Sequence, residues 1–113
     1  MATAQYNMGS LFRNGKGAPR DYAKAAAWFE KAAKWFFLAA KQNFRPAQHA
    51  LARMYAKGEG LPWDYAEAWF WMTLAAEGGY KGAKRALPSL EKKLSADQRR
   101  RAEELLQTRK RRG

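Results

Sequence analysis

Apolar side chains recur along this chain with the spacing of an amphipathic α-helix. Residues three and four positions apart lie on one face of a helix, so such spacing marks a face that packs against a neighbour. The spacing occurs twice in the first half of the chain, at Ala4, Met8, Leu11 and Phe12 and again at Ala47, Ala50, Leu51, Met54 and Tyr55. It predicts a helix in each of these two segments.

A glycine turn follows each of the two helices. Residues 15–17 and 58–60 both read Gly-x-Gly, and a proline stands two residues beyond each of them. Glycine adopts positive φ, and proline cannot continue the hydrogen-bond ladder of a helix. A second helix is then expected to begin at Asp21 and at Asp64, because an aspartate can accept hydrogen bonds from unpaired amides of the first turn. The unit is therefore helix, glycine turn, helix.

The second half of the chain carries further start and stop signals. Glu67 stands three residues after the second of these aspartates, which is capping-box spacing, and Gly78-Gly79 is expected to end that helix. Residues 95–98 read Ser-Ala-Asp-Gln, another capping box, which predicts a last helix. Pro88 is expected to kink the intervening helix or to make it restart at Ser89. Whether the tail packs over the second unit or extends away depends on that proline.

The two helix–turn–helix units are copies of one repeat. With a shift of 43 residues, Pro-Arg-Asp-Tyr-Ala at 19–23 aligns with Pro-Trp-Asp-Tyr-Ala at 62–66, and further downstream the best shift is 36. The difference of seven comes from a tandem heptad, since residues 28–34 read WFEKAAK and residues 35–41 read WFFLAAK. The underlying unit is about 36 residues long and present twice, with a third copy that begins near Tyr80 and then diverges.

We therefore expect a single all-α domain over residues 1–113, built as a short solenoid of helix-turn-helix repeats. Repeat 1 spans about residues 4–43 with the heptad insertion, and repeat 2 about residues 47–79; a partial third repeat with the last helix follows at 80–106, and a basic tail at 107–113. Composition agrees, because the chain has 23 alanines and 10 leucines but no valine or isoleucine. Alanine and leucine favour helices, whereas β-branched residues favour strands.

This spaced set of positions resembles the Sel-one-like repeat family, a relative of the tetratricopeptide repeat with units of about 36 residues. The pattern Ala-x-x-x-Met/Leu-Gly/Ala-x-x-Phe/Tyr, Gly-x-Gly, Asp-Tyr-Ala, Trp and paired alanines occurs twice between Ala4 and about Leu87. Ala52 departs from it, standing where the first repeat has Gly9. The resemblance implies a right-handed α-solenoid, finished by a C-terminal capping helix. It also implies a non-enzymatic scaffold for protein–protein interaction, often in bacterial envelope, secretion or host-contact settings.

The tandem heptad is expected to lengthen one helix. A helix from Asp21 to about Gln42 would project roughly 10 Å beyond its partner, at about 1.5 Å per residue. Depending on which copy takes the consensus place, the surplus carries Trp28 and Phe29, or else Trp35, Phe36 and Phe37. Two outcomes stay open: the tail helix covers this aromatic cluster, or the extension drives self-association or helix exchange between chains.

Trp63 is a second exposed-aromatic candidate. It lies in the turn of the second repeat, at the position that Arg20 holds in the first. A tryptophan on a turn can anchor a partner, since such residues dominate interface energetics; alternatively it covers the end of the neighbouring repeat. With Trp35, Phe36 and Phe37 it forms the candidate aromatic interface.

The first helix of each repeat is expected to line an inner groove. Helical spacing puts polar and basic residues on that face, namely Tyr6, Ser10 and Arg13 in the first repeat, His49, Arg53 and Lys57 in the second, and Arg85 in the third. Such a stripe favours an acidic protein or peptide, through charge steering and arginine–carboxylate pairs. The alternative is an ordinary solvated surface.

Charge is concentrated at the end of the chain, whose formal net charge is +12. Residues 81–113 carry twelve Lys and Arg against four acids. The alternative function is therefore binding of nucleic acid or another polyanion, with affinity that falls steeply with salt. Its candidate residues are Arg99, Arg100, Arg101, Arg109, Lys110, Arg111 and Arg112.

Chemistry has little support in the sequence. There is no cysteine and only one histidine, so disulfides, thiolate metal sites and a histidine metal cluster are not expected. We predict no catalytic residue, metal or cofactor. No apolar run approaches a membrane span, and residues 1–20 lack the apolar stretch of a signal peptide. The default expectation is the cytoplasm, or the periplasm if a signal was removed.

Overall fold

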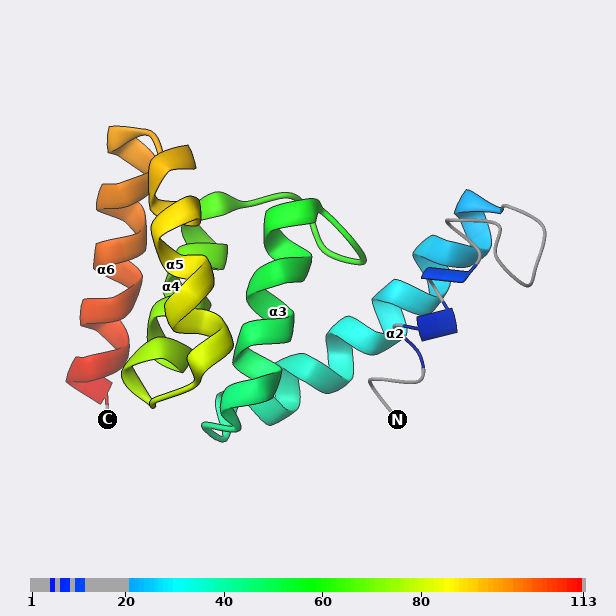
Figure 1. Ribbon diagram of the computed structural model, residues 1–113, viewed down its shortest axis with the longest axis horizontal. Coiled ribbons are helices and arrows are strands. Elements are labelled where there is room, and N and C mark those ends of the chain that lie inside the picture. Colours follow the sequence, from blue (N-terminus) through cyan, green and yellow to red (C-terminus); the bar gives the residue numbers. More distant parts are fainter. Residues whose placement is uncertain (1–4, 6, 9, 12–20, 113) are drawn as a thin grey trace.

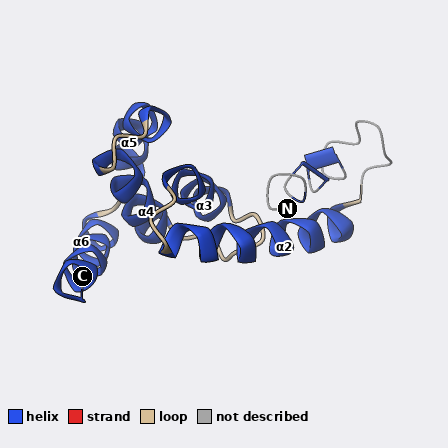
Figure 2. Cartoon of the chain, turned by 90° about the horizontal axis from the view of Figure 1, so that it is seen from below, coloured by secondary structure: helices blue, strands red, loops and turns tan. Residues whose placement is uncertain are grey.

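The computed structural model describes residues 5, 7, 8, 10, 11 and 21–112, with only the backbone of Tyr22 and Arg112. In that part of the chain every regular element is a helix, and no strand forms (Figure 2). The all-α class predicted from composition and periodicity is therefore confirmed.

Five helices follow one another along residues 22–112 (Figure 1). They are α2 (Tyr22–Lys41), α3 (Arg45–Lys57), α4 (Tyr65–Glu77), α5 (Lys81–Lys93) and α6 (Ala96–Arg112). α2, α3 and α4 each pack against the next helix in the chain, and α6 turns back to pack against α4. Figure 2 shows α5 and α6 on two different sides of α4. Helices α2 to α5 thus stack in sequence order, as a repeat array does.

α2 is the long helix that the tandem heptad predicts. It has 20 residues against 13 in α3, a difference of about two turns or roughly 10 Å. Asp21 caps its amino terminus, where a side-chain oxygen accepts a hydrogen bond from the Lys24 amide at 3.1 Å, and Gln42 is its C-cap. The amino-terminal half of α2 runs on beyond α3 (Figure 1).

The glycine turn of the second repeat seats α3 against α2. Gly58 ends α3 in the left-handed conformation with φ of 70°, and Gly60 also has positive φ, at 73°. A Cβ on Gly60 would lie 2.5 Å from the backbone carbonyl of Phe29 in α2. Glycine is needed there for two reasons, the dihedral and the close approach of two backbones.

α4 is buried on nearly every side. Nine consecutive or near-consecutive residues of this helix are buried: Ala66, Ala68, Trp69, Phe70, Trp71, Met72, Thr73, Leu74 and Ala75. A helix that is apolar all round requires neighbours on all sides, and here α3, α5 and α6 provide them. The main core of the described region is therefore centred on α4.

Pro88 does not divide α5, so of the two predicted outcomes, a kink or a restart at Ser89, the restart does not occur. Lys81–Lys93 form one helix with Pro88 inside it. Proline at this position deprives the Lys84 carbonyl of its helical hydrogen bond. Both residues are exposed, so water can satisfy that carbonyl and the helix continues.

The tail packs over the second repeat instead of extending away. α6 begins with the predicted capping box, in which the Ser95 amide donates to Gln98 Oε1 at 2.9 Å and the Gln98 amide donates to Ser95 Oγ at 3.1 Å. Further along α6, Ala102 and Leu106 are buried in the main core against α4.

Candidate functional site

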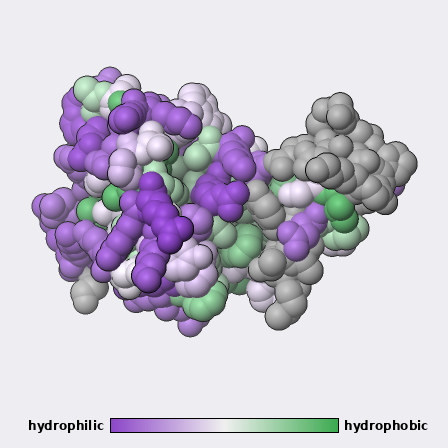
Figure 3. Space-filling model, in the orientation of Figure 1, coloured by the Kyte–Doolittle hydropathy of each residue, from purple (hydrophilic) through white to green (hydrophobic). Residues whose placement is uncertain are grey.

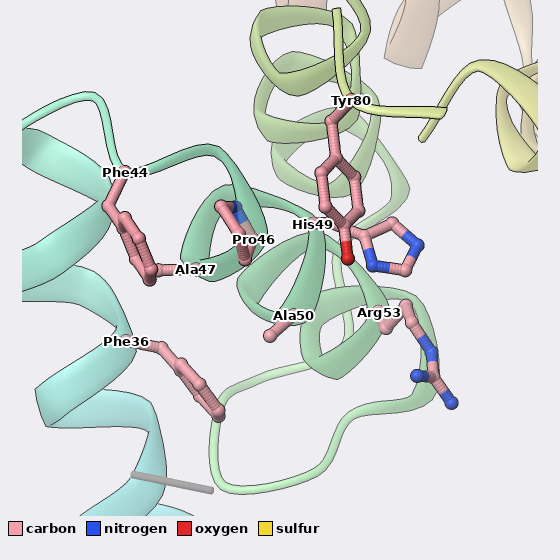
Figure 4. A pocket seen from close by; sticks show the side chains of 8 residues that line it. All are labelled: Phe36, Phe44, Pro46, Ala47, His49, Ala50, Arg53 and Tyr80. Carbon is pink, nitrogen blue, oxygen red and sulfur yellow. The ribbon is translucent and has the colours of Figure 1, made fainter. Parts of the chain in front are cut away.

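A hollow of about 370 Å³ opens beside α3, between the carboxy-terminal half of α2 and the start of α5 (Figure 4). Eight side chains line it: Phe36, Phe44, Pro46, Ala47, His49, Ala50, Arg53 and Tyr80. Figure 4 shows Phe36 and Phe44 on one side of the hollow, and His49, Arg53 and Tyr80 on the other. One wall is therefore apolar and the other carries the polar groups.

Two of the ring-bearing residues occupy equivalent places in successive repeats. Phe44 is the N-cap of α3 and Tyr80 is the N-cap of α5, and they lie 36 residues apart in the sequence. Neither side chain caps its helix by a hydrogen bond. The hollow lies between the starts of α3 and α5, and both rings line it.

His49 and Tyr80 form the polar wall. Their ring centroids are 5.1 Å apart with an interplanar angle of 46°. A Cβ on Gly82 would lie 3.0 Å from Tyr80 Cε2 and 3.6 Å from the imidazole of His49, so the bare glycine leaves room for both rings. Burial, and then the positive charge of Arg53, lower the pKa of His49 below its ordinary 6.5. The imidazole is therefore mostly neutral at pH 7.

Arg53 supplies the fixed positive charge of the hollow. It is exposed, and within the described part of the chain it forms no ion pair. A guanidinium beside apolar rings suits a ligand that offers an apolar side chain next to a carboxylate.

The structure brings together two of the predicted groove residues, His49 and Arg53. Lys57 and Arg85 are exposed but do not line the hollow, and neither does Ser10, which is half-buried. Tyr6 and Arg13 lie outside the described residues. The basic stripe predicted from helical spacing is thus represented here by its central part.

Phe36 differs from its expected place. It was predicted as part of an exposed aromatic interface, but it is half-buried, packs against both core clusters and lines the hollow. Periodicity locates a residue on a helix face but does not say which neighbour covers that face. Phe44, Pro46 and Tyr80 were not among the predicted site residues, although the 36-residue spacing of Phe44 and Tyr80 was available as a signal.

The other three aromatic candidates are exposed. Trp35, Phe37 and Trp63 retain 55%, 41% and 58% of their accessible surface. Phe29, in the first copy of the heptad, is buried, whereas Trp35 and Phe37 of the second copy are exposed. α6 does not cover Trp35. Trp63 stacks edge-on against Tyr65 at 4.9 Å within its own turn.

Most of the described C-terminal arginines already have partners. Arg99 pairs with Glu91 at 3.2 Å and with Glu103 at 3.1 Å, and Arg100 and Arg101 pair with Asp97 and Asp64. Arg109 donates to Asn43 Oδ1 at 2.7 Å and lies over the Trp71 ring. Lys110 and Arg111 are exposed, and the side chain of Arg112 is outside the described part.

The described residues also bear on two other kinds of site, a metal centre and a membrane-spanning helix. No three histidine, aspartate or glutamate side chains gather there in a way that could hold a metal ion. None of the described helices combines the length and the apolar character that a membrane crossing requires.

Comparison with known proteins gives one consistent result. A family model described as Sel1 repeat matches residues 2–34, 30–44 and 45–80. The middle match is short and contains the second copy of the heptad. No curated protein matches the sequence.

Two solved structures are similar to the chain. One is a protective antigen present in uropathogenic Escherichia coli strains and displaying an SLR fold, with 34% identity, a TM-score of 0.59, and coverage of 96% of this chain and 22% of that one. The other is a Sel1 repeat protein from Oxalobacter formigenes, with 31% identity, a TM-score of 0.47, and coverage of 76% and 33%. The chain therefore spans between a fifth and a third of the length of these relatives.

Proposed function

The chain belongs to the Sel1 repeat family, and on that premise we propose that it binds an acidic segment of another protein in the hollow beside α3. Sel1 repeat proteins are generally non-enzymatic scaffolds for protein interaction. The proposal adds where on this chain the partner binds and which chemical groups the partner presents. The segment would insert an apolar side chain between Phe36 and Phe44 and present a carboxylate to Arg53.

The observation that carries the proposal is the contrast between Arg53 and the arginines of α6. Arg99, Arg100 and Arg101 each lie against a carboxylate of this chain. Arg53 has no such partner in the described region, although it stands at an apolar hollow. An arginine–carboxylate hydrogen bond is stronger than a neutral one, so a partner's carboxylate would complete this site.

Long-range charge favours the same class of partner. The chain carries a formal net charge of +12, so its field attracts acidic proteins and speeds their association. Burial keeps His49 mostly neutral at pH 7, so Arg53 would carry the direct pairing. The neutral imidazole and the Tyr80 ring would contribute contact surface.

A peptide titration tests this assignment. The probe is a fluorescein-labelled peptide with one phenylalanine flanked by aspartates and glutamates, and the comparison peptide has glutamines and asparagines in their place. We expect Arg53→Glu to weaken binding of the acidic peptide by about tenfold or more. Arg111→Glu is the matched control, because it makes the same charge change at an exposed position away from the hollow. Equal losses in the two variants would show that only net charge matters and would overturn the site.

Polyanion binding through the C-terminal third remains the second hypothesis. The ion pairs of Arg99, Arg100 and Arg101 reduce the charge available on α6, where Lys110 and Arg111 are exposed and form no ion pair among the described residues. Titration of a duplex DNA probe over a salt series distinguishes the two readings. A steep salt slope that disappears when residues 107–113 are removed, with no binding of the acidic peptide, would favour the polyanion.

A further inference from the structure

The second copy of the heptad leaves an apolar face of α2 uncovered. Trp35 and Leu38 retain 55% and 53% of their accessible surface, and Phe44 next to them retains 58%. Together with Ala39 and Gln42 they line a shallow depression of about 470 Å³. We refer to these residues as the Trp35–Leu38 face. Figure 3 shows hydrophilic residues over α5 and α6, whereas hydrophobic ones reach the surface beside α2.

The same two positions are buried in the next repeat. Trp71 and Leu74 lie 36 residues after Trp35 and Leu38, and they retain only 4% and 8% of their surface. α6 contributes to their cover: the Arg109 guanidinium lies 5.9 Å from the Trp71 ring centroid, and Leu105 borders a second hollow together with Leu74. Within residues 21–112 no helix lies in the corresponding place over Trp35 and Leu38.

The helix that carries the Trp35–Leu38 face differs in charge from the helix that carries Trp71 and Leu74. α4 carries two glutamates and no basic residue, and the helix that packs on it, α6, carries seven basic residues against three acidic ones. α2 has the opposite character, with four lysines and one glutamate. If the pairing of α4 with α6 is transferred to α2, the covering helix should be acidic.

We propose that the Trp35–Leu38 face binds an amphipathic helix of another protein, one whose apolar stripe is flanked by acidic residues. The bound helix would lie on α2 as α6 lies on α4. Lys31 and Lys34 stand four residues before Trp35 and Leu38, so helical spacing puts them beside the apolar face. In the described region neither lysine forms an ion pair with a carboxylate.

A second copy of this chain fits the face less well. The helices that a second copy could offer are basic: α3 has three basic residues and no acidic one, and α5 has five against one. The acidic helix, α4, is enclosed in the core. Self-association would also bring together two chains that each carry +12. The occupant that matches α2 in charge is therefore a different, acidic protein.

This face is separate from the hollow assigned under the proposed function. Phe44 borders both, but Arg53 and His49 belong to the hollow only, and Trp35 and Leu38 belong to the face only. Variants at these residues therefore test the two assignments independently.

The test uses two designed helical peptides of about 18 residues, labelled with fluorescein and titrated by anisotropy. Both carry a leucine stripe; one has glutamates along its flanks and the other has lysines. The intact chain should bind the glutamate peptide at least about tenfold more tightly than the lysine peptide. Trp35→Ala combined with Leu38→Ala should lower the affinity for the glutamate peptide by about tenfold or more. Both side chains are exposed, so thermal unfolding should show an intact fold.

Trp63→Ala is the matched control, because Trp63 is as exposed as Trp35 but lies in a different turn. It should leave binding of the glutamate peptide unchanged, and Arg53→Glu should change it by much less than the Trp35 and Leu38 substitutions. Equal losses at Trp35 and Trp63, or equal affinity for both peptides, would overturn the proposal. So would sedimentation of a dimer that Leu38→Lys converts to a monomer, because the occupant would then be a second copy.

Discussion

Arg101 binds both carboxylate oxygens of Asp64, the residue that caps the amino terminus of α4. The same carboxylate accepts hydrogen bonds from the amides of Ala66 and Glu67. Burial acts to raise the pKa of Asp64, but the bonds from Arg101 and the two amides outweigh it, so the pKa is below its ordinary 3.8. Asp64 thus caps the amino terminus of α4 and, through Arg101, also connects α6 to α4.

Replacement of Asp64 should therefore cost more than loss of its arginine partner. Asp64→Ala removes the cap and the ion pair, and we expect the free energy of unfolding to fall by about 1–2 kcal/mol. Arg101→Ala removes only the pair, whose arginine is half exposed, and should cost about 0.2–1 kcal/mol. Urea unfolding of the two variants measures both effects. A larger loss for Arg101→Ala would contradict the dominance of the cap.

Acid should remove the contribution of this carboxylate. Because the pKa of Asp64 is lower in the folded chain than its ordinary 3.8, the stabilisation is present above pH 3.8 and is lost as the pH falls through the folded value. The stability difference between the intact chain and Asp64→Asn should shrink over that range. A difference that stays constant down to pH 2 would show that the pair adds no pH-dependent stability.

Gly60 should be far less replaceable than Gly79. Both have positive φ, at 73° and 90°, so alanine is strained at either position. At Gly60 the added Cβ would also meet the backbone of Phe29 at 2.5 Å, whereas at Gly79 nothing lies within 4 Å. Gly79→Ala should cost about 1–2 kcal/mol, and Gly60→Ala should exceed that by about 1–3 kcal/mol. Thermal unfolding of both variants measures the two losses of stability. Equal losses would show that the close approach of Gly60 to the backbone of α2 does not matter for stability.

The two tryptophans at equivalent repeat positions should respond differently to truncation. Trp71 is buried, so Trp71→Ala should cost about 3–5 kcal/mol through lost burial and a cavity. Trp35 is mostly exposed, and Trp35→Ala should change stability by about 0.5 kcal/mol or less. Denaturant unfolding of the two variants checks this. A large loss at Trp35 would mean that an additional segment packs on it in solution.

The single histidine offers a pH-dependent readout of the hollow. Burial and Arg53 lower the pKa of His49 below 6.5, so the neutral form stabilises the fold above pH 6.5 and this contribution is lost as the pH falls through the folded value. NMR titration of its one imidazole signal should give a pKa under 6.5. Arg53→Gln should raise it, and so should a bound acidic peptide. A pKa that does not respond to Arg53→Gln would remove the electrostatic link between the two residues.

Local signals in the sequence were sufficient for most of the fold. Asp21, Asp64 and Ser95 each start the helix that their short-range pattern predicted, because a cap depends on residues within one turn. The long α2 followed from the tandem heptad for the same reason. Such features need no knowledge of the neighbouring helices.

The candidate site depended on contacts between distant segments and was predicted only in part. His49 and Arg53 share one helix face, so spacing alone placed them together. Phe36 was assigned to the wrong environment because its burial depends on which side of α2 meets α3. The arginine run at 99–101 suggested free charge, but Arg101 reaches Asp64, 37 residues earlier in the chain. No local pattern reports such a pairing.

The enclosure of α4 also has a consequence for how the chain folds. Contacts between successive helices join residues that are near one another in the sequence, so they form quickly. The burial of α4, however, is complete only when α6 has also packed against it. We therefore expect the slowest amide hydrogen exchange in α4, and cooperative protection across residues 45–106. A chain that ends before α6 would leave Trp71 and Leu74 open to water and so be prone to aggregate, which makes the last helix part of the folding unit.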